Sequence, residues 1–269
     1  MFKDYLKNNN VLLDGAMGTM LQRRGHKLGE FPETLNVTKP QAIIDIHAEY
    51  VRAGARVLYA NTFGANGVKL AGSGYTAPEL ITAGVRLCRE AAGENAFVAL
   101  DIGPTGQLID NFGTLKFEDA YNAFREAAIA GERAGCDLAV IETMTDLSEL
   151  RAAVLAVKEN TALPVVATMT FEGSGRTFTG VTPAAFAVTA TGLSVDALGV
   201  NCSLGPRDLY GIVEELAEYT DLPLVVKANA GLPDMNGVYS VSPADFARAC
   251  ARFLSMGVSV IGGCCGTTP

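Results

Sequence analysis

Short apolar runs alternate with amphipathic stretches along the whole chain. Eight of the runs are near-continuously apolar, as expected for strands that are buried on both faces of a parallel sheet. These predicted strands are Val11–Gly15, Arg56–Asn61, Phe97–Gly103, Leu138–Thr143, Pro164–Phe171, Ala197–Cys202, Leu224–Gly231 and Val258–Cys265. Between them, stretches such as Gln41–Ala55, Phe117–Gly135 and Ser242–Gly257 have the apolar spacing of helices, and several begin at a capping residue and end at glycine.

Eight strands separated by seven helices predict a (β/α)8 TIM barrel of the α/β class. An open doubly wound sheet is the alternative. The regular count and the absence of a long linker favour the barrel, and a single domain over residues 1–269. An eighth helix is expected after Cys265, but the sequence holds four further residues. We therefore expect either a partly uncovered last strand or a fragment of a longer, multi-module protein.

Composition limits the classes of partner. The net charge of −8, without a block of Lys and Arg, argues against nucleic acid. No run of about 20 apolar residues indicates a membrane span, and the first ten residues lack the apolar stretch of a signal peptide. We expect a cytoplasmic protein whose six cysteines are reduced thiols or metal ligands.

Polar residues and glycines gather where the predicted strands end. Seven such segments are Asp14–Thr19, Asn61–Asn66, Asp101–Gly106, Glu142–Asp146, Asn201–Pro206, Asn229–Pro233 and Gly262–Gly266. Turn chemistry explains any one of them, because Gly, Asn, Asp and Pro form turns. In a barrel, however, all of them lie on the face that carries active sites. Two of the segments contain cysteine, so together they indicate a functional site.

Cys264 and Cys265 are neighbours at the end of the last predicted strand. A disulfide between them is disfavoured, because adjacent Cα atoms are about 3.8 Å apart and disulfides usually need about 4.4–6.8 Å. The two thiols can face one target only where the strand breaks, and the flanking glycines permit that break. Cys202 ends the sixth strand, and strands 6 and 8 flank strand 7, so the three sulfurs can converge.

Three converging thiolates need a cation, and zinc fits because it binds cysteine and prefers four ligands. Three protein ligands leave one open position, which is the catalytic pattern. The remaining cysteines, Cys88, Cys136 and Cys250, fall in or at the end of predicted helices and are interpreted as packing residues. Neither His26 nor His47 falls at a strand end, and His47 is interpreted as packed on its helix.

Three thiolates give the zinc site a net charge of −1, which suits binding of a fourth thiol better than activation of water. A coordinated thiol loses its proton. The residues therefore predict alkyl transfer to a zinc-bound substrate thiolate, with no nucleophile from the protein itself.

Six segments resemble the homocysteine S-methyltransferase family, and most nearly the N-terminal homocysteine-binding module of cobalamin-dependent methionine synthases. They are Leu12–Leu21, Asn61–Asn66, Asp101–Gly106, Gly199–Pro206, Asn229–Pro233 and Gly262–Pro269. The resemblance runs through essentially the whole chain. It implies a barrel that holds zinc through Cys202, Cys264 and Cys265, with homocysteine as the fourth, sulfur ligand.

The resemblance also assigns substrate contacts. Asp14, Gly15 and the loop Ala16–Thr19 match the loop that holds the amino-acid end of homocysteine. Glu142 matches the acid that pairs with its ammonium, and Asn229 matches an asparagine near the zinc that can be the fourth ligand without substrate. Simpler explanations remain open: Asp14 can cap a turn, and Glu142 can form a structural ion pair. Two further asparagines either contact the substrate or support the loops: Asn61 and Asn201.

The methyl donor is less determined. Enzymes that use betaine carry an aromatic residue where this chain has Gly64, and the chain has no Trp to cage a quaternary ammonium. The resemblance favours methylcobalamin on another module, charged by a folate-binding module, although no cobalamin signature occurs here. S-methylmethionine, betaine or a separate corrinoid protein are alternative donors. A zinc- or redox-sensing protein is the alternative of another class; a metal-free phosphate-binding barrel is disfavoured because no phosphate-binding glycine motif is present.

Overall fold

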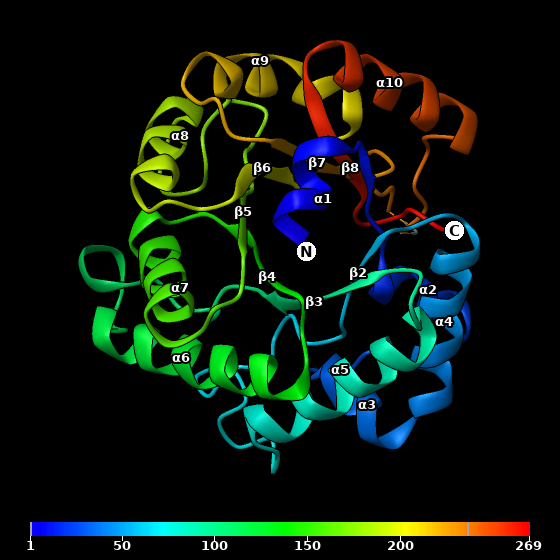
Figure 1. The fold of residues 1–269 in the computed structure, drawn as a ribbon, viewed down its shortest axis with the longest axis vertical. Coiled ribbons are helices and arrows are strands. Elements are labelled where there is room, and N and C mark those ends of the chain that lie inside the picture. The colour runs from blue at the N-terminus through cyan, green and yellow to red at the C-terminus, as the bar shows by residue number, and fades with distance from the viewer. Residues whose placement is uncertain (1, 236) are drawn as a thin grey trace.

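The computed structural model describes residues 2–235 and 237–269, and it forms a barrel of parallel strands ringed by helices (Figure 1). The strands are β1 (Val11–Leu12), β2 (Val57–Tyr59), β3 (Phe97–Ile102), β4 (Leu138–Met144), β5 (Val165–Met169), β6 (Ala197–Asn201), β7 (Leu224–Ala228) and β8 (Val258–Gly263). Their order is β1-β8-β7-β6-β5-β4-β3-β2. A parallel bridge between Leu13 and Val57 joins the two end strands. The predicted (β/α)8 barrel is therefore confirmed, and the open doubly wound sheet is wrong.

Seven crossover helices connect consecutive strands, as predicted. They are α4 (Pro40–Arg52), α5 (Ala77–Ala92), α6 (Phe117–Ala134), α7 (Leu147–Asn160), α8 (Pro183–Gly192), α9 (Tyr210–Glu218) and α10 (Pro243–Ser255). Three shorter helices were not anticipated: α1 (Phe2–Asn8), α2 (Met17–Arg23) and α3 (Leu35–Thr38). The predicted helix caps are present. Ser242 accepts a hydrogen bond from the Asp245 N–H at the start of α10, and Gly135 follows α6 with φ of 95°. Within the described residues, no helix has the length and apolarity needed to cross a membrane.

Several strands end earlier than the apolar runs suggested. β6 ends at Asn201 because Cys202 and Ser203 have left-handed backbones, with φ of 61° and 56°. Such angles lie outside the β region, so the chain leaves the sheet there. β8 likewise ends at Gly263, which places Cys264 and Cys265 just beyond the strand. The strand therefore breaks where Cys264 and Cys265 must leave the sheet for both thiols to face one target.

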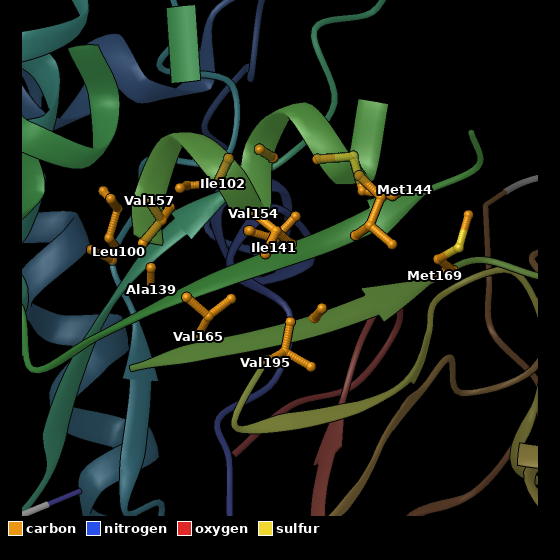
Figure 2. Close-up of a cluster of buried hydrophobic side chains, with 14 of the residues drawn as sticks. Leu100, Ile102, Ala139, Ile141, Met144, Val154, Val157, Val165, Met169 and Val195 are labelled. Carbon is orange, nitrogen blue, oxygen red and sulfur yellow. The ribbon is translucent and has the colours of Figure 1, made fainter. Parts of the chain in front are cut away.

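The main core lies between the barrel and its helices. Figure 2 shows one part of it, where Ile141 of β4 lies against Val154 of α7, and Val157 lies one turn farther along that helix. All three side chains are fully buried. A second core fills the barrel interior, and α1 lies across that end of the barrel (Figure 1). The Phe2 ring packs edge-on against Phe97, the first residue of β3, with centroids 5.4 Å apart. Because α1 covers the amino ends of the strands, the opposite mouth is left for a site.

One side of the barrel lacks a covering helix in the described residues. The outer faces of β1 and β8 border a cavity of about 610 Å³ between α4 and α10, lined by Leu12, Ile261 and Phe246 among others. Leu12 is 45 % exposed, although it belongs to a strand. The expectation of a partly uncovered last strand is met within these residues.

Candidate functional site

Three cysteine sulfurs come together at the carboxyl ends of β6 and β8. The Sγ atoms of Cys202, Cys264 and Cys265 all lie within 4.8 Å of one another. The separation between the Cys202 and Cys265 sulfurs is 3.9 Å. Tetrahedral zinc with sulfur ligands at about 2.3 Å requires sulfurs about 3.8 Å apart. The sulfur set therefore fits a zinc ion.

The three clustered thiols shift one another's pKa. Hydrogen bonds from Cys264 and then Cys265 lower the pKa of the Cys202 thiol below its ordinary value. Hydrogen bonding to Cys202 raises the pKa of both partner thiols. One thiolate thus forms at the expense of the other two, and three thiolates at one point need a positive ion to balance them.

The turn that carries the paired cysteines is fastened to neighbouring loops. The Thr267 hydroxyl donates a hydrogen bond to the Cys264 carbonyl oxygen at 2.7 Å. The Thr267 hydroxyl oxygen also accepts a hydrogen bond from the Ala16 N–H at 3.2 Å. The Gly266 N–H donates to the Thr19 hydroxyl at 3.0 Å. Two predicted substrate-loop residues, Ala16 and Thr19, therefore also hold the cysteine turn in place.

A cavity of about 250 Å³ opens beside the sulfurs. The predicted site residues on its wall are Gly15, Ala16, Thr19, Asn61, Glu142, Cys202, Cys264 and Cys265. Three predicted residues are not on this wall: Asp14, Asn201 and Asn229. The wall also contains residues that sequence reasoning did not select: Glu33, Tyr59, Phe63, Asp101, Thr143 and Lys227. One cavity thus joins the sulfur cluster to several buried carboxylates.

Lys227 of β7 lies between two of these carboxylates. Its Nζ atom is 3.5 Å from Asp14 Oδ1 and 3.9 Å from Glu142 Oε2. It also lies 4.0 Å from the centroid of the Tyr59 ring. The three charged side chains are at most 8 % exposed. The other carboxylate oxygen of Asp14, Oδ2, accepts a hydrogen bond from the Tyr59 N–H at 2.8 Å, which fixes the side chain.

Burial dominates the electrostatics of this group. It raises the pKa of Asp14 to about 6, against the lowering effect of Lys227. It also raises the pKa of Glu142 and of Asp101, and Glu142 raises that of Asp101 further. Neither Asp14 Oδ1 nor Glu142 Oε2 receives a hydrogen bond from any described residue. Both oxygens therefore retain capacity to accept one.

Both asparagines predicted as contacts or supports form hydrogen bonds to neighbouring segments. The Asn201 carboxamide oxygen accepts from the Thr143 N–H and from the Thr168 hydroxyl, each at 2.8 Å. The Asn61 amide donates to the Asn36 side-chain oxygen at 2.9 Å. For Asn201 the geometry favours the supporting alternative, whereas Asn61 lines the cavity as well.

Asn229 stands immediately beyond β7, close to the sulfurs. Its side chain hydrogen-bonds to Cys202 and helps to lower the pKa of that thiol. Its side-chain oxygen is buried and has no hydrogen-bond partner among residues 2–235 and 237–269. A buried carboxamide oxygen without a partner beside three thiols is available to a cation.

The other cysteines and His47 are core residues, as predicted. Cys88, Cys136 and Cys250 are buried, and burial raises the pKa of each thiol. His47 is fully buried, and burial lowers its pKa to about 4, so its imidazole is neutral. None of the four joins the sulfur cluster.

This (β/α)8 barrel gathers three cysteine sulfurs at the carboxyl ends of its strands, which is where barrel enzymes carry their active sites. The profile of the homocysteine S-methyltransferase family matches residues 11–269. The chain belongs to this family.

Two curated relatives bear the name methionine synthase. The protein from Mycobacterium tuberculosis (strain ATCC 25618 / H37Rv) is 32 % identical over 289 aligned residues, which cover 99 % of this chain and 24 % of the relative. The protein from Mycobacterium leprae (strain TN) is 32 % identical, covering 95 % of this chain and 23 % of that one. The chain thus spans about a quarter of the length of these relatives.

Solved structures agree with this placement. The homocysteine methyltransferase MmuM from Escherichia coli matches in its oxidized form with a TM-score of 0.85 and 26 % identity, covering 98 % of this chain and 94 % of that one. Its metallated form matches with a TM-score of 0.83 and 27 % identity, with the same coverage. The carboxyl transferase domain of Rhizobium etli pyruvate carboxylase, at 16 % identity and a TM-score of 0.54, shares the fold alone; it covers 98 % of this chain and 41 % of that chain.

Proposed function

We propose that this chain transfers a methyl group to the sulfur of homocysteine, giving methionine. The observation that carries the proposal is the convergence of three cysteine sulfurs within 4.8 Å beside a cavity that also contains the buried Glu142. Family membership supports homocysteine as the substrate. The name of the mycobacterial relatives supports methionine as the product.

Zinc is the proposed cofactor. Cys202, Cys264 and Cys265 would hold it, and the buried, unpartnered side-chain oxygen of Asn229 would be the fourth ligand when substrate is absent. When bound, zinc supplies the positive charge that lets the substrate thiol lose its proton at neutral pH. A metallated form of MmuM supports a metal at this kind of site.

The remaining groups orient the amino acid. Glu142 is proposed to bind the ammonium through its unpartnered oxygen, and backbone N–H groups of the loop Gly15–Thr19 to bind the carboxylate. Asp14 is not on the cavity wall, so its proposed part in substrate binding is indirect, through Lys227. The substrate sulfur then attacks the donor methyl group, so that a sulfur–carbon bond forms and the donor departs with the electrons of the broken bond. No protein side chain serves as the nucleophile.

The proposed donor is methylcobalamin carried by another module and charged by a folate-binding module. The support is that this chain matches about a quarter of the length of proteins named methionine synthase. We accordingly propose that residues 1–269 form one homocysteine-binding module of a multi-module protein. Assays with methylcobalamin, S-methylmethionine and betaine as alternative donors to homocysteine test this choice. If only S-methylmethionine or only betaine donates its methyl group, that compound would replace methylcobalamin as the proposed donor.

Zinc K-edge X-ray absorption on the purified chain, with and without homocysteine, tests the function directly. We expect three sulfur ligands that rise to four when homocysteine is added. An unchanged count would contradict thiol activation. Zinc that leaves reversibly with peroxide and never gains a substrate sulfur would instead support a redox sensor.

A further inference from the structure

Lys227 is the one cation on the cavity wall described above, and the proposed reaction has no step that requires it. It lies in the apolar strand β7, and its side chain is 6 % exposed. A lysine this deeply buried is rare unless opposite charges surround it. The groups that face it are Glu142, Asp14, Tyr59 and Cys264.

The arrangement is asymmetric. Asp14 lies away from the cavity wall, fixed by the Tyr59 N–H, and turns its other oxygen toward the lysine. Glu142 is on the wall, and the oxygen nearest Lys227 accepts no hydrogen bond in the described structure. At 3.9 Å the lysine attracts Glu142 without occupying its lone pairs. Glu142 is therefore left able to accept hydrogen bonds from a ligand.

The buried carboxyl groups near Lys227 also interact with one another. Asp14, Glu142 and Glu33 are buried carboxyl groups that interact electrostatically with a fourth, Asp101, and Lys227 is the one lysine among the described residues that acts on Asp101. Burial and mutual repulsion raise the pKa of Asp101 well above its ordinary value, which favours its neutral form. Asp14 and Glu142 both lie near Lys227, so one ammonium stands between two carboxyl groups, and a ligand ammonium would add a second positive charge beside Glu142.

We propose that Lys227 is a positioning residue that makes the site selective for thiols bearing an amino group. It pairs with Asp14 within the protein and holds Glu142 at the cavity wall, where Glu142 accepts the substrate ammonium. This inference rests on the proposed homocysteine function.

Three thiols of matched length separate this role from others: homocysteine; 3-aminopropane-1-thiol, which lacks the carboxylate; and 4-mercaptobutanoate, which lacks the amino group. Their dissociation constants are measured by calorimetry on zinc-loaded chains. We expect Lys227→Met to weaken homocysteine and the aminothiol by at least about tenfold, with 4-mercaptobutanoate and the zinc content unchanged. Lys227→Arg is expected to restore most of the affinity for the two amines.

Because Lys227→Met leaves two buried carboxylates facing each other, it risks failing to fold. The double variant Lys227→Met with Asp14→Asn removes one charge of each sign and keeps the net charge of the group. We expect it to fold and to bind the aminothiol more tightly than Lys227→Met alone. The proposal would be overturned if the double variant bound the aminothiol no more tightly than Lys227→Met does. If Lys227→Met does not fold, the proposal would be overturned if the double variant showed no detectable aminothiol binding.

Other outcomes also contradict the proposal. Equal losses for all three thiols would indicate a general structural role, and a loss confined to 4-mercaptobutanoate and homocysteine would make Lys227 a carboxylate anchor. Unchanged affinities for all three thiols would show that Lys227 has no part in substrate recognition. Failure of the unmodified zinc-loaded chain to bind homocysteine would instead refute the proposed function, so the two failures are distinguishable.

Discussion

The side-chain oxygen of Asn201 lies 2.8 Å from the backbone nitrogen of Thr143 and accepts its hydrogen bond. The bond crosses from the end of β6 to β4, over β5 between them. Each partner is next to a proposed functional residue, Asn201 beside Cys202 and Thr143 beside Glu142. Both Thr143 and Cys202 have left-handed backbones, with φ of 62° and 61°. One carboxamide thus couples the backbone turn at Cys202 to the turn that follows Glu142.

Removing any one of the three clustered thiols should remove the metal. We expect Cys202→Ala, Cys264→Ala and Cys265→Ala each to reduce bound zinc to background and to abolish methyl transfer, because two thiolates hold zinc much more weakly than three. Circular dichroism should show the barrel retained, since all three sulfurs lie outside the strands. Cys250→Ala is the control, with full zinc content expected. A fully active variant at any of the three positions would make the metal assignment wrong.

Glu142→Gln should weaken homocysteine binding while leaving zinc in place. The glutamine keeps the shape of the side chain but loses the charge that a substrate ammonium needs. A buried hydrogen bond to a charged group contributes about 1.5–3 kcal/mol, so we expect the dissociation constant to rise about 10- to 100-fold. Calorimetry measures this rise, and Glu90→Gln on the exposed surface of α5 is the matched control. Equal affinities in the two variants would leave Glu142 as a structural ion pair.

The sulfur cluster could be predicted from the sequence because a right-handed βα alternation fixes the order of the strands. Once β6 and β8 flank β7, Cys202 and the pair Cys264–Cys265 must end on the same mouth. The glycines around the pair indicated the break in the strand. Local residue types and strand order were therefore sufficient for this part of the site.

The sequence placed Asp14, Glu142 and Asp101 at strand ends on one barrel face, but their grouping around Lys227 could not be predicted in the same way. Its members come from strands on opposite sides of the barrel, and whether their side chains meet depends on the barrel radius and on side-chain length rather than on strand order. The available signal was a lysine inside the apolar run of β7. Helix α1 was not predicted for the same reason. It is short, and the signal for it is its packing on the end of the barrel, which depends on the folded structure.

Asn201→Ala should destabilise the fold and disturb Glu142, the acid proposed to bind the substrate ammonium. The substitution leaves the Thr143 N–H and the Thr168 hydroxyl without their acceptor in a buried region. Each lost partner costs about 1–3 kcal/mol, so we expect unfolding to become easier by about 2–4 kcal/mol in urea denaturation, with weaker homocysteine binding. Asn160→Ala, at the half-buried end of α7, is the comparison and should cost less. Equal losses of stability would show that Asn201 does not support the site.

His47 should make folding stability depend on pH. Burial lowers its pKa to about 4 from the ordinary 6.5, and neither ring nitrogen has a hydrogen-bond partner in the described part of the chain. Between these values the unfolded chain binds a proton that the folded chain does not, so the free energy of unfolding rises with pH. The contribution of His47 is complete above about pH 6.5 and is lost progressively toward pH 4, by about 3 kcal/mol.

His47→Leu isolates this contribution, because leucine has a similar volume and does not titrate. Asp14 acts in the opposite direction over part of the same range, since its pKa is raised to about 6 and its folded form binds the extra proton. The quantity to compare is therefore the difference in unfolding free energy between His47→Leu and the unmodified chain, measured in urea from pH 4 to pH 7.5. We expect the variant to gain relative stability steadily as the pH falls below 6.5. A difference that stays constant across this range would show that His47 is protonated alike in the folded and unfolded chains, and its burial as a neutral imidazole would be wrong.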